Sequence, residues 1–262
     1  MSRPIKFTVV TSTFNAGDAL AATGKSLRAQ TYRTFEWIII DGASTDNTIE
    51  VARGFGDLVS LLISEPDSGI YSAWNKALSR ITGDWVLFLG AGDELFDEGT
   101  FANVAVALSD FPSHASIAYG SVVETDGPTG RELRVRNESW MGIGGRWVMG
   151  RPILPCHQGV FHRTSLFLSG FKFDVRCKIS ADNEILLREF IKGNGLKLQL
   201  TVARFRLDGV SYQRINRLRM IAESVYVNFK VGIFFKRPFY QIAVLMSNSI
   251  KHIPRLLGFI KV

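Results

Sequence analysis

The chain has 262 residues, of which 46% are hydrophobic and 21% charged, so it can bury a substantial core and does not belong to the disordered class. Its two cysteines, Cys156 and Cys177, are too few for a disulfide framework and too far apart for a paired zinc or redox site, which favours a reducing compartment. The first residues lack a small-residue cleavage pattern, so we expect no signal peptide.

Within the first hundred residues, strand and helix patterns alternate. Apolar or β-branched runs predict strands at residues 7–13, 35–40, 59–64 and 85–89, and helices are predicted over 19–30, after 45–48 and over 71–81. The run 85–89 is almost entirely apolar, as expected when helices cover both faces of a parallel sheet. The alternation predicts an α/β fold with a Rossmann-like mixed sheet flanked by helices.

Polar residues follow each of these four strands. The clusters are Thr11–Asn15, Asp41–Asp46, Glu65–Gly69 and Gly90–Asp93. Since ligands in such sheets bind outside the carboxyl ends of the strands, we expect the four clusters to converge on one site. The alternative is four unrelated loop ends.

The pattern changes in the second part of the chain. Strands are predicted at residues 117–124 and 132–136 around the turn 126–130, an extended Gly- and Pro-rich loop at 137–155, and a helix with an apolar stripe at 181–192. Long loops in compact domains are commonly functional, so the loop at 137–155 is expected to contribute to a site.

Two of the polar segments carry motifs. Glu65–Lys76 reads Glu-Pro-Asp-x-Gly-Ile-Tyr-x-Ala-x-Asn-Lys, and Asp41–Asp46 reads Asp-Gly-x-Ser-x-Asp. With both motifs the chain resembles an inverting family 2 glycosyltransferase of the GT-A fold, the bacterial type that builds surface polysaccharides from nucleotide sugars. The resemblance covers about residues 5–215. It implies a catalytic domain at 1–215, with a nucleotide-sugar half at about 1–97 and an acceptor half at about 98–215.

The resemblance also implies a set of donor-binding residues. They are Thr11, Phe14, Asn15, Asp41, Ser44, Asp46, Asp67, Gly69, Asn75, Lys76 and Gly92. A carboxylate at Asp41 can accept hydrogen bonds from a uracil or guanine N–H and from ribose hydroxyls, which suits a nucleoside. Taken alone, Asp41–Asp46 is also a common strand-to-helix turn, and Lys76 could be a solvated side chain on a capped helix.

The divalent-metal motif is reduced in this chain. In the family an Asp-x-Asp motif holds Mg²⁺ or Mn²⁺ against the diphosphate, and Gly90-Ala91-Gly92-Asp93 occupies its place. Only Asp93 supplies a carboxylate there, and oxygen ligands are what such hard cations prefer. The resemblance therefore implies a Mn²⁺ or Mg²⁺ site at Asp93, with Glu94 as a further ligand or a solvated neighbour.

A general base is expected at the start of the helix 181–192. Inverting transfer needs one carboxylate to remove the acceptor proton, and Asp182 aligns with the catalytic carboxylate of the family. Ala181 replaces the Glu that often precedes it. Asp182 could instead cap the helix, in which case Glu184 is the alternative base.

Two later motifs complete the resemblance. His157-Gln158, followed by Phe161, resembles a His-Gln-x-x-Phe motif near the acceptor and the sugar, which implies a part in positioning them. A lone histidine is otherwise more often structural. Arg206–Ser211 resembles a late Gly-Gly-x-Ser turn that would close over the diphosphate, and a plain turn is the alternative.

The positive charge is concentrated at the end of the chain. The formal net charge is +7, but residues 204–262 hold 11 Lys and Arg against 2 Asp and Glu. We expect residues 216–262 to form an amphipathic, basic helical extension. Its longest uncharged run, 238–250, is too short to span a bilayer.

Such an extension can lie in the interface of an anionic membrane. We therefore expect residues 218–262 to bind the inner face of the cell membrane peripherally, from the cytoplasm, where a lipid-linked acceptor would also lie. Packing on the catalytic domain, or on a second copy in a homo-oligomer, is the alternative. No nucleic-acid reader motif is present.

The sequence thus favours transfer of a sugar from a UDP- or GDP-sugar to a hydroxyl of a glycan, lipid-linked acceptor. A nucleotidyltransferase is a competing hypothesis, but its Gly-rich, Arg- or Lys-bearing loop is absent from residues 11–18. A catalytically silent nucleotide-sugar-binding subunit or scaffold is the other alternative, because the metal motif is reduced and the Glu before Asp182 is missing.

Overall fold

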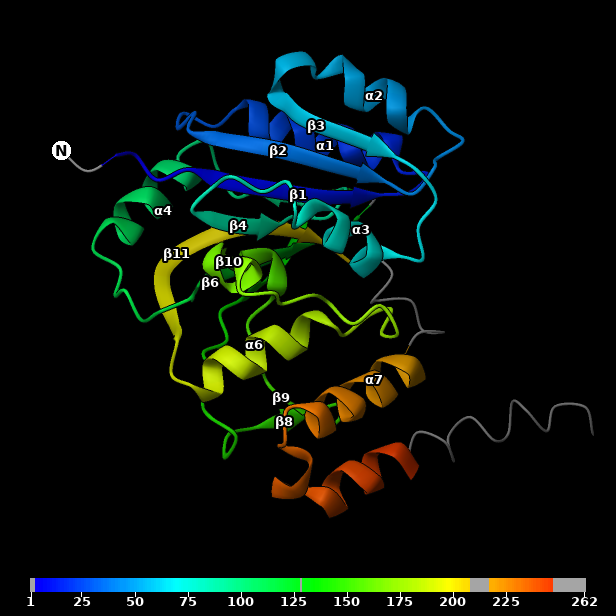
Figure 1. Ribbon diagram of the computed structural model, residues 1–262, viewed down its shortest axis with the longest axis vertical. Coiled ribbons are helices and arrows are strands. Elements are labelled where there is room, and N and C mark those ends of the chain that lie inside the picture. The colour runs from blue at the N-terminus through cyan, green and yellow to red at the C-terminus, as the bar shows by residue number, and fades with distance from the viewer. Residues whose placement is uncertain (1–2, 128, 208–216, 247–262) are drawn as a thin grey trace, which may run out of the picture.

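The computed structural model describes residues 3–127, 129–207 and 217–246, and it is built around a mixed sheet (Figure 1). The strands of that sheet are β1 (Phe7–Thr13), β2 (Phe35–Asp41), β3 (Val59–Ser64), β4 (Trp85–Phe88), β5 (Glu94–Leu95), β6 (Ile117–Thr125), β7 (Glu132–Arg136), β10 (Val160–Arg163) and β11 (Gly195–Arg206). Their order is β3-β2-β1-β4-β10-β6-β11-β5, and β7 pairs with β6 off this path. This confirms the predicted α/β fold.

The first four strands form a parallel half. β1 pairs in parallel with β2 and β4, and β2 pairs in parallel with β3. All four strands therefore end at one edge, which brings the loops after them together. β10 then runs antiparallel between β4 and β6, and it joins this half to the pair formed by β6 and β11.

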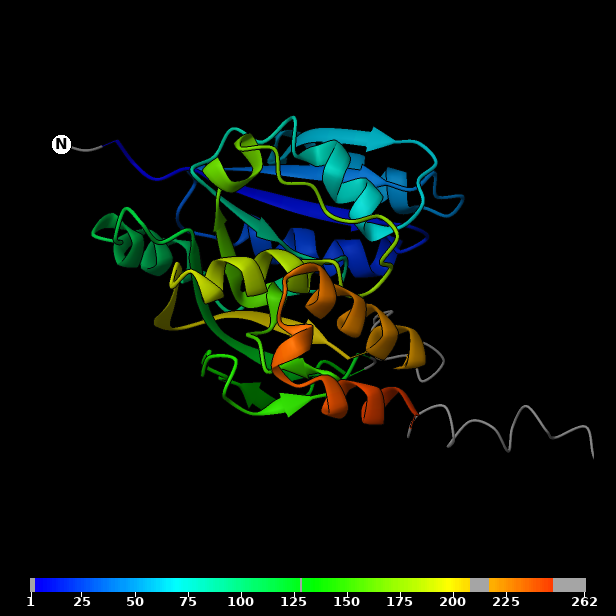
Figure 2. The same ribbon diagram turned by 60° about the horizontal axis from the view of Figure 1, so that its bottom comes forward.

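Helices cover both faces of the sheet (Figures 1 and 2). The helices are α1 (Gly17–Arg28), α2 (Thr48–Gly54), α3 (Ile70–Ala77), α4 (Thr100–Ser109), α5 (Ser165–Leu168), α6 (Asp182–Ile191) and α7 (Arg217–Lys230), with short 3₁₀ turns η1 (Gly56–Leu58), η2 (His157–Gly159) and η5 (Phe234–Lys236). Neighbouring residues of β1 face opposite layers: Val9 packs in the core with α1 and α4, and Val10 in the core with α3 and α6.

Several elements were not predicted. They include the strands β5, β10 and β11 and the helices α4 and α5. The expected loop at 137–155 is wrong in part, because it contains a small antiparallel hairpin of β8 (Trp147–Val148) and β9 (Arg151–Pro152). The helix predicted over 71–81 ends at Ala77, where the chain turns toward β4.

The segment after residue 216 packs on the catalytic body as far as the structure describes it. Ile221, Val227 and Ile233 are each at most 2% exposed, and the last two belong to the core that also contains α3 and α6. Residues 238–246 form one more helical stretch beside the β8–β9 hairpin. Within the described residues, no helix has the length and apolarity needed to cross a bilayer.

Candidate active site

A cavity of about 550 Å³ lies at the carboxyl edge of the parallel half of the sheet. It is lined by Ser12, Thr13, Phe14, Ala16, Gly42, Asp67, Gly69, Ile70, Tyr71, Trp74, Phe88, Gly90, Ala91, Asp93, His157, Gln158, Lys178, Ile179, Asp182, Phe205 and Arg206. The loops after β1, β2, β3 and β4 all contribute, as the sequence predicts. The cavity also receives η2, the start of α6 and the end of β11, which lie far along the chain.

Some of the predicted site residues hold the loops and do not line the cavity. Asp41 is fully buried, and its Oδ2 accepts hydrogen bonds from the Ser44 backbone N–H at 2.9 Å and from the Ser64 hydroxyl at 2.7 Å. Ser44 Oγ in turn accepts the backbone N–H of Asn15 at 2.8 Å. These contacts tie the loops after β1, β2 and β3 together, and a direct donor-binding role for Asp41, Ser44 and Asn15 stays a prediction.

Thr11 and Asp46 also have partners within the protein. The Thr11 hydroxyl accepts the indole N–H of Trp37 at 2.9 Å beneath the loop. Asp46 accepts the backbone N–H of Thr48 at 3.0 Å at the start of α2, and the Thr48 hydroxyl lowers the pKa of this carboxyl. Of the residues predicted in the first two loops, Phe14 is the one that reaches the cavity.

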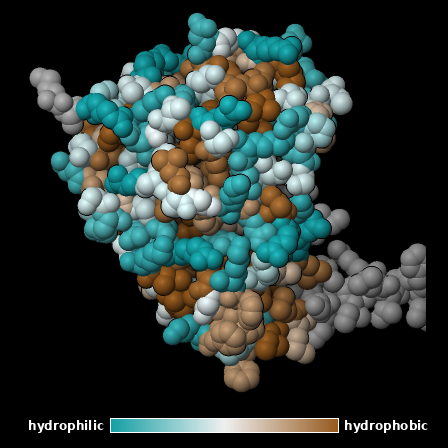
Figure 3. All heavy atoms as spheres, viewed as in Figure 1, coloured by the Kyte–Doolittle hydropathy of each residue, from teal (hydrophilic) through white to brown (hydrophobic). Residues whose placement is uncertain are grey.

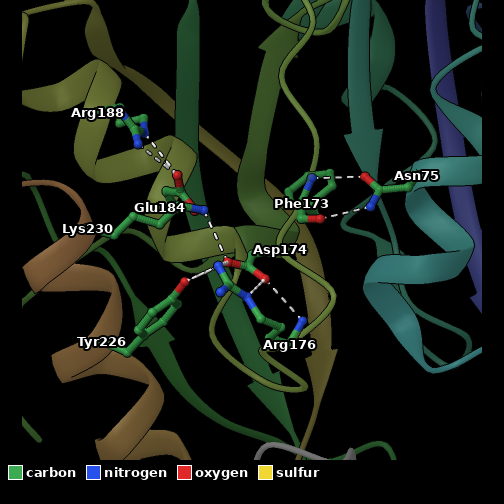
Figure 4. A network of polar contacts seen from close by, with 8 residues as sticks. All are labelled: Asn75, Phe173, Asp174, Arg176, Glu184, Arg188, Tyr226 and Lys230. Atoms are coloured by element: carbon green, nitrogen blue, oxygen red, sulfur yellow. Dashed lines mark hydrogen bonds and ion pairs between the residues drawn. The ribbon is translucent and has the colours of Figure 1, made fainter.

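The Glu65–Lys76 motif lines the cavity with part of its residues and supports it with others. Asp67 and Gly69 line the cavity, and Asp67 Oδ1 accepts the Gly69 backbone N–H at 2.7 Å. Asn75 exchanges two hydrogen bonds of 2.8 Å with the backbone of Phe173 (Figure 4). Lys76 pairs with Glu65 at 2.9 Å and donates to a backbone carbonyl. Asn75 and Lys76 therefore fix the shape of the motif in this structure.

Asp182 lines the cavity at the first residue of α6. Its Oδ1 accepts a hydrogen bond of 2.9 Å from the hydroxyl of Tyr71, which projects from α3. Burial raises the pKa of Asp182, while the hydrogen bond from Tyr71 and the charge of Arg151 oppose the rise. Burial and the charge of Asp182 raise the pKa of Tyr71 well above its usual value, so Tyr71 keeps its proton and remains a donor. Tyr71 belongs to the motif, but the motif alone assigns it no role.

Asp93 lies on the loop after β4 and is 5% exposed. It accepts the backbone N–H groups of Gly90 and Arg206, each at 3.2 Å. Burial raises the pKa of Asp93 to about 7. The hydrogen bonds from the two backbone N–H groups and from Gln158, and the charge of Arg206, lower this pKa and partly offset the effect of burial. Gly92 adopts a φ of 98° and lies beside the Arg206 side chain. Asp93, Gln158 and Arg206 therefore form one polar corner of the cavity.

This corner fits a cation that takes few ligands from the protein. No group of three His, Cys, Asp or Glu residues is close enough to hold a metal anywhere in the described part of the chain. A Mg²⁺-like ion, however, commonly takes one or two carboxylates and completes its shell with substrate phosphates and water. Asp93 can supply that single carboxylate, because its two oxygens have more acceptor capacity than Gly90, Arg206 and Gln158 use.

His157 lies under the cavity as part of an aromatic cluster. Its ring stacks on Trp74 at 5.2 Å and on Phe88 at 5.7 Å between centroids. Burial lowers its pKa to about 3, so the ring is neutral at physiological pH. Its Nε2 is buried without a hydrogen-bond partner among the described residues. His157 lines the cavity, and its predicted sugar-positioning role stays a prediction.

Glu184, the alternative base, does not line the cavity, and its carboxylate lies between Arg188 and Lys230 (Figure 4). Its carboxylate pairs with Arg188 at 2.9 Å and with Lys230 of α7 at 2.7 Å. The pair with Lys230 joins α6 to α7, and Asp182 is the carboxylate of α6 that lines the cavity. Of the late turn at 206–211, Arg206 lines the cavity, and 208–211 lie outside the described residues.

Residues 8–164 match the family described as Glycosyl transferase family 2, which is more than half of the chain. The chain belongs to glycosyl transferase family 2. This family 2 glycosyltransferase is 31% identical over 196 residues to the PGL/p-HBAD biosynthesis glycosyltransferase of Mycobacterium tuberculosis, with 72% of this chain and 71% of that protein covered. The family assignment decides against a nucleotidyltransferase.

Solved structures share the fold of this family 2 glycosyltransferase. Staphylococcus aureus TarS in complex with UDP matches with a TM-score of 0.64 and 18% identity, covering 90% of this chain and 72% of that one. The mannosyltransferase PcManGT of Pyrobaculum calidifontis, in complex with GDP-Man and Mn²⁺, matches with a TM-score of 0.65 and 14% identity, covering 100% and 77%. The GT-A fold expected from the sequence is thereby confirmed.

Proposed function

We propose that this family 2 glycosyltransferase is an inverting enzyme that moves a sugar from a UDP- or GDP-sugar to a hydroxyl of a glycan acceptor. The observation that carries the proposal is that Asp182 and Asp93 line one cavity, from loops far apart in the sequence, with the hydroxyl of Tyr71 on Asp182. The two carboxylates suit two tasks: removal of a proton and support of a charged leaving group.

Asp182 is the general base in this proposal. In inverting transfer the acceptor oxygen attacks the anomeric carbon while the nucleoside diphosphate departs, and one carboxylate takes the hydroxyl proton. Burial raises the pKa of Asp182, which makes its ionised form a stronger base. The hydrogen bond from Tyr71 holds the carboxylate in one orientation.

Asp93 would hold the divalent cation, Mn²⁺ or Mg²⁺, with oxygens of the donor diphosphate and water as the remaining ligands. When bound, such a cation neutralises charge on the departing diphosphate. PcManGT, which was solved with GDP-Man and Mn²⁺, supports this assignment through its shared fold. Arg206 lies at the same corner and adds positive charge to it.

The donor nucleotide is proposed to occupy the side of the cavity formed by Phe14, Asp67 and Gly69. Phe14 is 64% exposed, so it presents an aromatic ring that a nucleobase can cover. The UDP complex of TarS and the GDP-Man complex of PcManGT support a UDP- or GDP-sugar. His157 and Gln158 are proposed to position the sugar or the acceptor from the floor of the cavity.

We also propose that the acceptor is lipid-linked and that the enzyme lies peripherally on the inner face of the cell membrane. The support is an apolar surface over η5 and the helical residues 238–246 (Figure 3). Its exposed side chains are Phe229, Phe235, Phe239, Ile242 and Met246. Lys236 is exposed beside them, so an anionic bilayer would meet apolar and positive groups together.

The experiment that tests the transfer chemistry replaces the base. Asp182→Asn is expected to lower kcat by about 10²–10⁴-fold, the usual contribution of a general base, with nucleotide binding retained. UDP- and GDP-sugars are first screened for thermal stabilisation of the protein with Mn²⁺, and transfer is then measured with the stabilising donors. The matched variant Glu184→Gln removes a carboxylate on the same helix that faces Lys230, and it is expected to keep kcat.

The outcomes separate the hypotheses. Unchanged transfer by Asp182→Asn would show that the base is another residue. If the unaltered protein binds nucleotide sugars but transfers none across the donor screen, the nucleotide-sugar-binding subunit is the better description. A product that retains the anomeric configuration of the donor would contradict inversion.

A further inference from the structure

Glu223 on α7 binds the loop that carries the proposed base. Its Oε1 accepts the backbone N–H of Lys178 at 2.8 Å, and its Oε2 accepts the backbone N–H groups of Ile179 and Ser180 at 2.8 and 3.0 Å. Three consecutive N–H groups thus converge on one carboxylate from a helix that comes much later in the chain. Asp182 follows shortly after the last of them.

The three contacts join backbone N–H groups to a carboxylate at 2.8 to 3.0 Å, so they are charge-assisted hydrogen bonds. Residues 178–180 lie outside the strands and helices, so their backbone N–H groups need an acceptor from elsewhere in the protein. Hydrogen bonds to a charged group each contribute more than neutral ones, and the loss of one partner leaves the other groups unpaired. The loop geometry therefore depends on Glu223.

The same loop faces the donor motif as well as the base. Lys178 and Ile179 line the cavity, and Lys178 Nζ donates to the backbone carbonyl of Ser68 at 2.6 Å. Ser68 lies between Asp67 and Gly69 of the donor motif. The segment held by Glu223 therefore links the proposed donor side of the cavity to Asp182.

Helix α7 is itself fixed in place around Glu223. The Tyr226 hydroxyl donates to Asp174 at 2.9 Å, and Lys230 pairs with Asp174 and Glu184 (Figure 4). On the neighbouring face, Asn228 donates to the backbone carbonyl of Gly150. Glu223 therefore projects from a helix that cannot shift without breaking several contacts, which is what a positioning group needs.

We propose that Glu223 is a positioning residue for sugar transfer, which holds Lys178–Ser180 so that the Asp182 carboxylate meets the acceptor hydroxyl. The proposal rests on the proposed role of Asp182 as the base. It makes α7 a support for the active site, although no described residue of α7 lines the cavity.

The test compares Glu223→Gln with Glu36→Gln in the full-length protein. In both variants Gln keeps the size of the side chain but loses the charge and one acceptor oxygen, and Glu36 is a buried carboxylate that accepts the Thr82 backbone N–H at 2.6 Å and does not line the cavity. Glu223→Gln is expected to lower kcat by roughly 10–100-fold, because small misplacements of a reacting group have effects of that size. KM for the donor and binding of UDP or GDP are expected to change little.

Two further measurements separate positioning from a general loss of stability. Amide hydrogen exchange at Lys178–Ser180 is expected to be roughly 10-fold faster in Glu223→Gln than in Glu36→Gln. In the Asp182→Asn background, Glu223→Gln is expected to change the residual rate less than about 2-fold, since residues that act through one another are not additive. If the Glu223→Gln protein does not fold, the Glu223→Asp variant is tested in its place, because Asp has a shorter side chain.

Each outcome bears on one hypothesis. Equal kcat for Glu223→Gln and Glu36→Gln, unchanged exchange at 178–180, or a full additive loss in the Asp182→Asn background would each overturn the positioning role. The exchange measurement does not depend on activity, so it tests the Glu223 contact by itself. Absence of sugar transfer by the unaltered protein would instead count against the proposed function.

Discussion

At the residue scale, burial raises the pKa of both Asp93 and Asp182, but the partners of the two carboxyl groups differ. Asp93 is surrounded by backbone N–H groups and the charge of Arg206, which suits a group that holds a cation and a diphosphate. Asp182 accepts a hydrogen bond from a neutral side chain, Tyr71, which orients it without neutralising it. The proposed division between base and metal ligand follows from these surroundings.

The hydrogen bond between Tyr71 and Asp182 predicts a pH effect. The phenol favours the ionised carboxylate, so Tyr71→Phe raises the pKa of Asp182 further. Because the base must be ionised, the acidic limb of kcat/KM is expected to move to higher pH. Tyr32→Phe, which loses a comparable bond to the carbonyl of Ile5, is the control. An acidic limb that moves equally in both variants, or in neither, would contradict the contact.

At the scale of elements, the turn into α3 depends on one backbone conformation. Gly69 has φ 121° and ψ −179° as the residue before α3, a region that only glycine occupies readily. Its position lets Asp67 accept the Gly69 N–H and directs Tyr71 toward Asp182. The motif is therefore a geometric unit, in which Asn75 and Lys76 fix the far side.

Gly69→Ala is expected to cost about 1–3 kcal/mol of stability, because the strain comes from φ and not from crowding. The added Cβ would lie 3.8 Å from its nearest neighbour, a carbon of the Lys178 side chain. Gly170→Ala is the matched control, since Gly170 has φ 95° and open space around it. Both variants should melt earlier, but only Gly69→Ala should also weaken UDP or GDP binding in a calorimetric titration. Equal nucleotide affinity in the two would place the donor elsewhere.

At the scale of the whole molecule, the C-terminal segment has two faces. Ile221, Val227 and Ile233 are buried against the body, and α7 binds the base loop through Glu223. The opposite face exposes Phe235 and Phe239, which are 70% and 86% exposed. The sequence left packing on the catalytic body and binding to a membrane as alternatives for this segment. The buried face packs on the body, and the exposed apolar face is the one proposed to bind a membrane.

The membrane proposal predicts the behaviour of a surface variant. Phe235→Ala with Phe239→Ala is expected to reduce co-sedimentation with anionic phosphatidylserine vesicles at least several-fold, since each buried aromatic side chain contributes about 1.5–3 kcal/mol. Leu168→Ala, which removes a side chain 76% exposed on α5, is the control. Equal sedimentation of all three proteins would contradict the proposal. Loss of a dimer in the double variant, seen by size-exclusion chromatography, would assign the surface to a second copy.

The parallel half of the fold was predictable because its signals are local. β1 and β3 match their predicted bounds, since a β-branched run followed by polar breakers specifies a buried strand. β10 was not predictable: its residues, Val160–Arg163, are too few to show a period, and their antiparallel place depends on β4 and β6. β11 pairs with β6 although several other elements separate the two strands in the sequence, and no local pattern encodes that contact.

The sequence by itself determined the family, the parallel α/β half and most of the residues that could carry chemistry, because motif spacing and hydrophobic period are properties of short segments. Only the tertiary structure decided which of those residues reach the cavity. Asp41, Asn75 and Lys76 satisfy buried or backbone groups around it, while Asp93 and Asp182 line it. It also revealed Glu223, because a hydrogen bond between segments far apart in the sequence depends on how the helices pack.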